Sequence, residues 1–253
     1  MTSDAPATVT GLVVLTVDSE SYALTTVDLA VDMAASLKSR IQGLFIEDED
    51  LVRAADLPFT REITFPSAQE RTTDASMMRR SLRTMGAQFK QYLETRAQAS
   101  QVQWSYDYIQ GRNLKVGLVA NPNVIYTIMG QAIYRRPQST HHHRPRKLLL
   151  VENHSPHLYN ALEVVVRSFG DEPVEVVRIK NNNGNTKIDA IRQYSSLAEK
   201  RNLTILELQH LQLHKIIADS SIVFDYAIVS RHEPLDSLNQ ICTQLRCPII
   251  LVS

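Results

Sequence analysis

The chain has only two cysteines, Cys242 and Cys247, among its 253 residues. Two cysteines cannot form the disulfide framework of a small secreted domain, so we expect two reduced, buried thiols in a cytoplasmic protein. The chain also has no apolar run near the ~20 residues that cross a bilayer. Its first ten residues are polar and lack the basic start and apolar stretch of a secretory signal. We therefore expect no membrane insertion.

An excess of charge of one sign is missing as well. Lys and Arg together number 27, and so do Asp and Glu. General binders of nucleic acid or of anionic membranes usually carry a basic excess, so we expect no nucleic-acid partner. Catalytic motifs are also missing, since the chain has no P-loop, no Gly-x-Ser-x-Gly elbow and no Cys-x-x-Cys pair. The sequence favours a binding or regulatory protein, not an enzyme.

Short apolar runs alternate with helical stretches, which is the pattern of a parallel sheet with crossover helices. Residues 11–17, GLVVLTV, suit a strand that is covered on both faces. The stretch that follows, to about residue 39, has apolar residues at helical spacing. Residues 41–46 and 102–109 predict two further strands. The first half of the chain therefore predicts an α/β unit.

A long insertion separates the second and third predicted strands. It contains Pro58 and Pro66, which break regular structure, and it ends in a predicted helix over 74–98. A connection of this length in a compact α/β domain is usually functional or part of an interface. Residues 124–129 that follow the third strand are ambiguous. We favour a strand there, after a short helix over 112–121, but their i, i+4, i+8 apolar spacing also fits a helix.

After a stretch rich in proline and histidine, the alternating pattern begins again. The expected organisation is a first domain over 1–138, a linker over 139–146 and a second domain over 147–253. In the second domain strands are expected at 147–151, 174–179, 203–208, 222–229 and 248–252, with helices between them. The two halves share an order of elements more than a sequence, so the repeat is architectural.

Several segments in this order resemble the universal stress protein family in its tandem form. The first strand ends in Asp and is followed by a Ser-rich helix start (LVVLTVDSES, 12–21), and the last helix leads into a final strand that begins with proline (LNQICTQLRCPIILV, 238–252). Further similar segments are GLFIED (43–48), LPFTREI (57–63) and WSYDYIQG (104–111). The resemblance covers nearly the whole chain.

The resemblance implies two open parallel sheets with flanking helices, of the Rossmann-like, HUP type. Many members of the family bind ATP through a glycine motif after the fourth strand, where backbone amides approach the phosphates. In the first unit Gly130 fits this motif, but the next required glycine is Ile133. In the second unit the same place reads SRHEP, residues 230–234, without a glycine. The usual phosphate cradle is therefore expected in neither unit.

The first unit has too little chain between Gly130 and Lys147 for another helix and a fifth strand. Without a fifth strand the unit would expose a sheet edge, which proteins rarely leave unprotected. We expect the second unit or another chain to cover that edge. The partners implied are therefore an intrachain pseudo-dimer or a homo-oligomer, with a further protein partner in addition.

Ligands of open parallel sheets bind beyond the carboxyl ends of the strands. The nucleotide candidates at that rim are Asp18, Ser19, Ile46 and Gly130 of the first unit. Our main hypothesis is a non-catalytic regulatory module of the stress response, with no cofactor and no metal. The alternative is a member that binds ATP or AMP through the first unit, with slow hydrolysis. A third hypothesis is a flavoprotein-like adenine binder with the same sheet.

Two other groups of residues invite a functional interpretation. His141, His142 and His143 are adjacent in the linker, where neighbouring residues rarely converge on one metal ion. Five basic residues lie in or beside the same stretch and could contact an anionic partner. Such a run of charge is more often a solvated linker. They are Arg135, Arg136, Arg144, Arg146 and Lys147.

Overall fold

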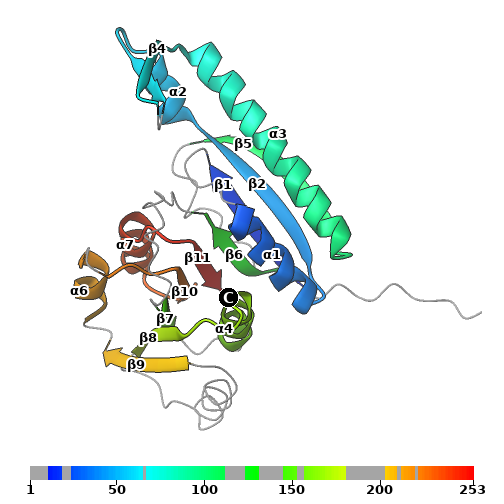
Figure 1. Cartoon of the computed structure of the whole chain (residues 1–253), viewed down its shortest axis with the longest axis vertical. Coiled ribbons are helices and arrows are strands. Elements are labelled where there is room, and N and C mark those ends of the chain that lie inside the picture. Colours follow the sequence, from blue (N-terminus) through cyan, green and yellow to red (C-terminus); the bar gives the residue numbers. More distant parts are fainter. Residues whose placement is uncertain are drawn as a thin grey trace, which may run out of the picture.

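The computed structural model describes residues 11–18, 24–64, 67–111, 123–130, 145–152, 157–180, 203–209, 212–219 and 222–253. These residues form one nine-stranded sheet with flanking helices and a separate two-stranded ribbon (Figure 1). The nine strands form two groups, and within each group all strands run parallel; a single antiparallel pairing joins the groups. The predicted α/β class of two Rossmann-like parallel units is confirmed.

The first unit contributes four adjacent parallel strands in the order β5-β2-β1-β6. β1 is buried along almost its whole length, as expected for an apolar run between covered faces. The elements are β1 (Leu12–Asp18), α1 (Leu24–Ser36), β2 (Arg40–Asp48), β5 (Trp104–Gly111) and β6 (Val124–Met129). The ambiguous residues 124–129 are therefore a strand, which confirms the favoured interpretation. The short helix expected over 112–121 lies outside the described residues.

The long insertion folds as a helix, a ribbon and a second helix, α2 (Glu49–Ala55), β3 (Arg61–Thr64), β4 (Gln69–Thr72) and α3 (Ala75–Ala99). Asp48 and Asp74 cap the two helices, since their carboxylates accept the backbone N–H of Asp50 and Met77. The helix predicted over 74–98 is confirmed. The ribbon was not predicted, because its polar residues show no strand-like alternation.

The second unit contributes five parallel strands in the order β11-β10-β7-β8-β9. Numbered along each unit, both groups follow the order 3-2-1-4, and the second adds a fifth strand, as in the first five strands of a doubly wound sheet of order 3-2-1-4-5-6. The elements are β7 (Arg146–Glu152), α4 (His157–Ser168), β8 (Val174–Lys180), β9 (Leu203–Gln209), α6 (Leu213–Ala218), β10 (Tyr226–Ser230), α7 (Leu235–Gln244) and β11 (Ile249–Val252). β10 begins later than expected, because Ile222 first turns back to Asp219 through a backbone hydrogen bond.

The two units meet where β11 pairs antiparallel with β6. Ile250 lies opposite Ile128, and the pairing continues to Ser253, whose N–H donates to the Ile125 carbonyl at 3.1 Å. β11 therefore occupies the place beside β6 that a fifth strand of the first unit would take. This confirms the expectation that the second unit covers the open edge. The domain boundaries at 138, 139–146 and 147 stay predictions, although β7 already begins at Arg146.

One hydrophobic core runs under both units. On one face of the sheet, buried side chains of α1, α3 and α4 pack with strands of both units in a single cluster. On the other face of the second unit, a second cluster lies between the sheet, α6 and α7. Cys242 and Cys247 are free thiols buried in that second cluster, as expected. Because the first cluster includes both units, neither unit has a core of its own on that face.

Phe59, between α2 and β3, has a left-handed backbone (φ +67°) and is 98% exposed. A side chain with a Cβ is strained in this conformation, and Asn tolerates it better. Since no burial is lost, we expect Phe59→Asn to raise the free energy of unfolding by about 0.5–1 kcal/mol. Urea denaturation would measure the change. Leu57→Asn, at an exposed neighbour without a positive φ, is the control, and an equal gain there would contradict the strain argument.

Candidate functional site

Three of the four predicted nucleotide candidates meet at the carboxyl-terminal rim of the first unit. Asp18 ends β1 and lies opposite Ile46 of β2, while the N–H of Gly130, just after β6, donates to the Thr16 carbonyl at 3.1 Å. Asp18 is partly exposed and Ile46 is buried. Ser19 lies outside the described residues. The structure therefore brings the predicted residues of three adjacent strands together, and their role in binding stays a prediction.

A buried carboxylate, Glu47, lies at the same end of β2. The Tyr108 hydroxyl donates to its Oε2, and the Gln110 amide donates to its Oε1 at 3.1 Å. The Arg79 guanidinium of α3 approaches Oε1 at 3.7 Å. A buried carboxylate is stable only with such partners, so the network ties β2, β5 and α3 together. Burial, with the acceptor Glu47 beside it, raises the pKa of Tyr108, which keeps the hydroxyl a donor.

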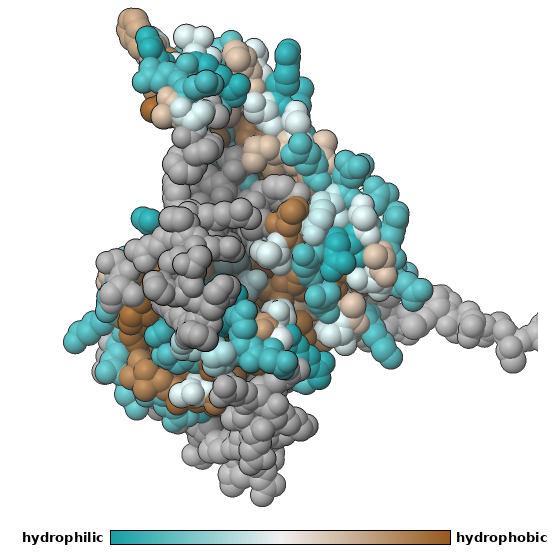
Figure 2. Space-filling view, viewed as in Figure 1, coloured by the Kyte–Doolittle hydropathy of each residue, from teal (hydrophilic) through white to brown (hydrophobic). Residues whose placement is uncertain are grey.

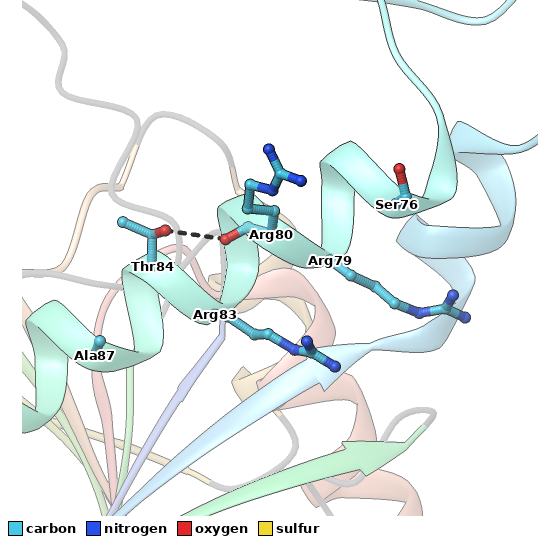
Figure 3. A pocket seen from close by; sticks show the side chains of 6 residues that line it. All are labelled: Ser76, Arg79, Arg80, Arg83, Thr84 and Ala87. Atoms are coloured by element: carbon cyan, nitrogen blue, oxygen red, sulfur yellow. Dashed lines mark hydrogen bonds between the residues drawn. The ribbon is translucent and has the colours of Figure 1, made fainter.

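Two adjoining surface grooves follow α3. The first, of about 550 Å³, is lined by α3 alone, and the second, of about 410 Å³, is lined by α3 and β5. Arg83 and Ala87 line both of them. We call the second one the α3–β5 groove and define it by Arg83, Lys90, Tyr106, Tyr108 and Gln110. Figure 3 shows Arg79 and Arg83 pointing to the same side of α3; Arg80 points in another direction and also lines the first groove. The groove is basic on its helix side and aromatic on its strand side.

The tyrosines of the groove are held by contacts within the protein. The Tyr106 hydroxyl donates to the Gly86 carbonyl at 3.1 Å, and its ring lies edge-on to Phe89. The Tyr108 ring stacks on Phe45 with centroids 5.4 Å apart. Sequence reasoning missed this surface, although the spacing of Arg79, Arg83 and Lys90 along one helix could have indicated a basic stripe.

The corresponding rim of the second unit is filled by an ion-pair network. Glu152 ends β7 as Asp18 ends β1, but its side chain is only 10% exposed. Arg178 of β8, with 3% exposed, donates through Nε to Glu152 Oε2 at 2.8 Å and also contacts Glu207 of β9. The Tyr159 hydroxyl of α4 donates to the other oxygen of Glu152 at 2.9 Å. Both oxygens of this carboxylate are therefore bonded within the protein.

The loop at the end of β10, residues 230–234, is anchored to the other unit. The Arg231 guanidinium donates to the Val124 carbonyl at the start of β6, at 2.8 Å. The backbone N–H of Arg231 donates to the Val252 carbonyl at 2.7 Å. Burial lowers the pKa of Arg231. Glu233, two residues on, is also buried. The loop thus presents side chains and a buried carboxylate in place of a bare backbone.

The other groups singled out in the sequence have structural roles or lie outside the described residues. Arg146 pairs with Glu172 and Asp225, and Lys147 pairs with Glu175, so these two cations stabilise the second unit. The remaining basic residues of the linker and its three histidines are not described. Among the residues that are, no three His, Cys, Asp or Glu side chains gather as metal ligands. None of the described helices is long and apolar enough to cross a membrane.

No protein-family model and no curated protein matches the chain. Solved structures with a similar fold include a universal stress protein from Archaeoglobus fulgidus DSM 4304, with 9% identity, coverage of 95% of this chain and 98% of that one, and a TM-score of 0.43. A member of the universal stress protein family from Burkholderia pseudomallei has 13% identity, coverage of 80% and 98%, and a TM-score of 0.31.

The cytoplasmic domain of a prokaryotic cation chloride cotransporter is similar to the same extent, with 11% identity, coverage of 95% of this chain and 94% of that one, and a TM-score of 0.43. At these identities the likeness concerns the fold alone.

Proposed function

We propose that the chain is a non-catalytic binding module of the universal-stress-protein-like kind, which acts in the cytoplasm as part of a stress response. In this proposal the second unit is the structural half, and the first unit carries the binding surfaces. The observation that carries the proposal is the filled rim of the second unit, where Glu152 is held by Arg178 and Tyr159.

This filled rim opposes a bound triphosphate for two physical reasons. A phosphate placed there would face the Glu152 carboxylate, and drawing Arg178 away to neutralise it would leave Glu152 buried and unpaired, which costs several kcal/mol. The loop after β10 would also have to release Arg231 from the Val124 carbonyl. Arg178 is therefore already used within the second unit, and Arg231 is already used in holding the two units together.

We expect no stoichiometric binding of Mg-ATP to the purified protein. Isothermal titration or equilibrium dialysis with labelled ATP should give no saturable site tighter than a Kd of about 1 mM, which corresponds to ~4 kcal/mol. The Arg231→Gly variant is a useful comparison, because it removes the side chain that fills the loop. Micromolar binding of one or two ATP molecules to the unaltered chain would contradict the proposal.

One observation favours a second candidate, a nucleotide-binding first unit. Asp18 is partly exposed at the rim, and its strand β1 lies next to β6, which Gly130 follows. If the unaltered chain binds ATP or AMP there, Asp18→Asn should weaken the affinity roughly tenfold, since a polar contact to the ligand is lost. Asp107→Asn, on the exposed strand β5, is the matched control and should leave the affinity unchanged. Equal affinities for all three proteins would exclude this candidate.

A further inference from the structure

β5 is an end strand of the nine-stranded sheet, and no described strand pairs with its outer side. It is eight residues long, contains no proline, and pairs with β2 in unbroken register. It therefore lacks two common devices that protect an edge, proline and a bulge. The Gln103 carbonyl accepts the Ile41 N–H of β2, so alternate residues from Trp104 to Gln110 direct their peptide groups outward.

The residues with outward peptide groups are also the residues that border the α3–β5 groove. Tyr106, Tyr108 and Gln110 line it from the strand, and Arg83 and Lys90 line it from the helix. Arg79 is already directed to Glu47, and Lys90 lies over the Tyr106 ring at 5.9 Å. A chain that paired with β5 would therefore place every second side chain beside a basic helix face.

We propose that this edge binds an extended acidic peptide segment of a partner protein, which adds to the sheet as a further strand beside β5. Backbone hydrogen bonds supply affinity, and carboxylates on the face toward α3 bond Arg83 and Lys90, as in other cases of strand addition. Arg83 and Lys90 are seven helical positions apart, about 10 Å along the axis. Same-face residues of a strand repeat every ~7 Å, so two nearby carboxylates can reach both cations. The inference rests on the proposed binding function and names its partner class.

Two other occupants fit this surface less well. Single-stranded nucleic acid binds basic grooves by stacking bases on aromatic rings, but here one ring face of Tyr108 stacks on Phe45 and Lys90 covers Tyr106. A second copy of the chain would meet the first through the same surface. Arg83 and Lys90 of one copy would then approach the same cations of the other, and like charges oppose such a contact.

Fluorescence anisotropy with a labelled decapeptide of alternating glutamate and threonine tests the proposal on the full-length protein. Binding should weaken when salt is raised from about 50 to about 500 mM, because it depends on charge. The same peptide with alternate backbone nitrogens methylated should not bind, since it cannot pair with β5. An alternating lysine and threonine peptide and an oligothymidylate should bind at least ~10-fold more weakly.

Charge-reversal variants separate the groove from the general charge of the protein. Arg83→Glu and Lys90→Glu should each raise the Kd for the acidic peptide about tenfold or more. Arg167→Glu makes the same change of net charge on the exposed surface of α4, outside both grooves, and should change the Kd by less than about twofold. Thermal melting checks that the variants fold, and Arg83→Gln replaces Arg83→Glu if the latter does not.

Three results would overturn the proposal. They are no binding of the acidic peptide to the unaltered chain, equal binding of the methylated peptide, and equal losses for the Arg167 and Arg83 variants. Tighter binding of the oligothymidylate would assign the groove to nucleic acid instead. The ATP titration without peptide tests the filled rim of the second unit separately, so the two proposals can fail independently.

Discussion

Replacing Tyr126 by alanine should lower the free energy of unfolding of the whole chain by about 3–5 kcal/mol, the cost of emptying a large buried site. Tyr126 lies in β6 of the first unit with no exposed surface, and its hydroxyl donates to the His157 carbonyl of α4 at 2.7 Å. Its ring also lies edge-on to His157. Tyr126→Phe is the matched variant, since it removes only the hydrogen bond and should cost ~1 kcal/mol.

The same experiment tests whether the two units unfold together. Trp104, in β5, is the only tryptophan of the chain, so its fluorescence reports on the first unit. The only two cysteines lie in the second unit, and burial raises the pKa of the Cys247 thiol, so its alkylation reports on opening of that unit. Because one core cluster spans both units, we expect coincident urea transitions by the two probes. Tyr126→Ala should shift both transitions equally, and a shift of the fluorescence transition alone would show that the units unfold separately.

The edge strand β5 could be predicted from the alternation of its residues. Other strands could be predicted because their apolar runs are buried by neighbours on both faces. β1, β7 and β8 are of this kind, and the ends of β1 and β6 place Asp18 and Gly130 at one rim as expected. The ribbon of β3 and β4 could not be predicted in this way. Its residues are exposed and held by the cross-strand pairs Arg61–Glu70 and Arg71–Glu62, which produce no apolar alternation.

The pairing between the two units could be predicted only in part. The short stretch between Gly130 and Lys147 was enough to predict an open edge, and the known cost of such edges predicted a cover. Nothing in the local pattern of residues 249–252 shows that they pair with β6, because pairing partners and direction depend on contacts between distant segments. β11 pairs with β6 in the antiparallel direction, because this arrangement buries both hydrophobic clusters at once.

The filled rim of the second unit could not be predicted from the sequence either. Arg178 is the fifth residue of VEVVRIK, where a charged residue in a strand usually indicates a solvent-facing position. In the folded chain Glu152 of β7 and Glu207 of β9 flank it, and α4 adds Tyr159. The charge could be recognised as buried only once three strands and a helix were placed together.

We expect Arg178→Met to lower the free energy of unfolding by about 3–5 kcal/mol, since it leaves Glu152 buried without its cation. The control is Arg167→Met, which breaks an exposed pair with Glu163 in the same unit, where the arginine side chain is 61% exposed. Its cost should stay within about 0.5 kcal/mol. Urea denaturation measures both changes, and equal losses would mean that the Arg178 pair behaves as a surface pair.

The double variant Arg178→Met with Glu152→Leu completes the test. Replacing a whole buried ion pair by apolar side chains of similar volume is often neutral, although Tyr159 then loses its acceptor. We therefore expect the double variant to recover most of the stability that Arg178→Met loses, with a coupling energy within the ~0.5–3 kcal/mol range of contacting residues. Additive losses would show that Glu152 and Arg178 act independently. The rim of the second unit would then not be held closed by their pairing, and the physical basis for excluding a nucleotide there would be lost.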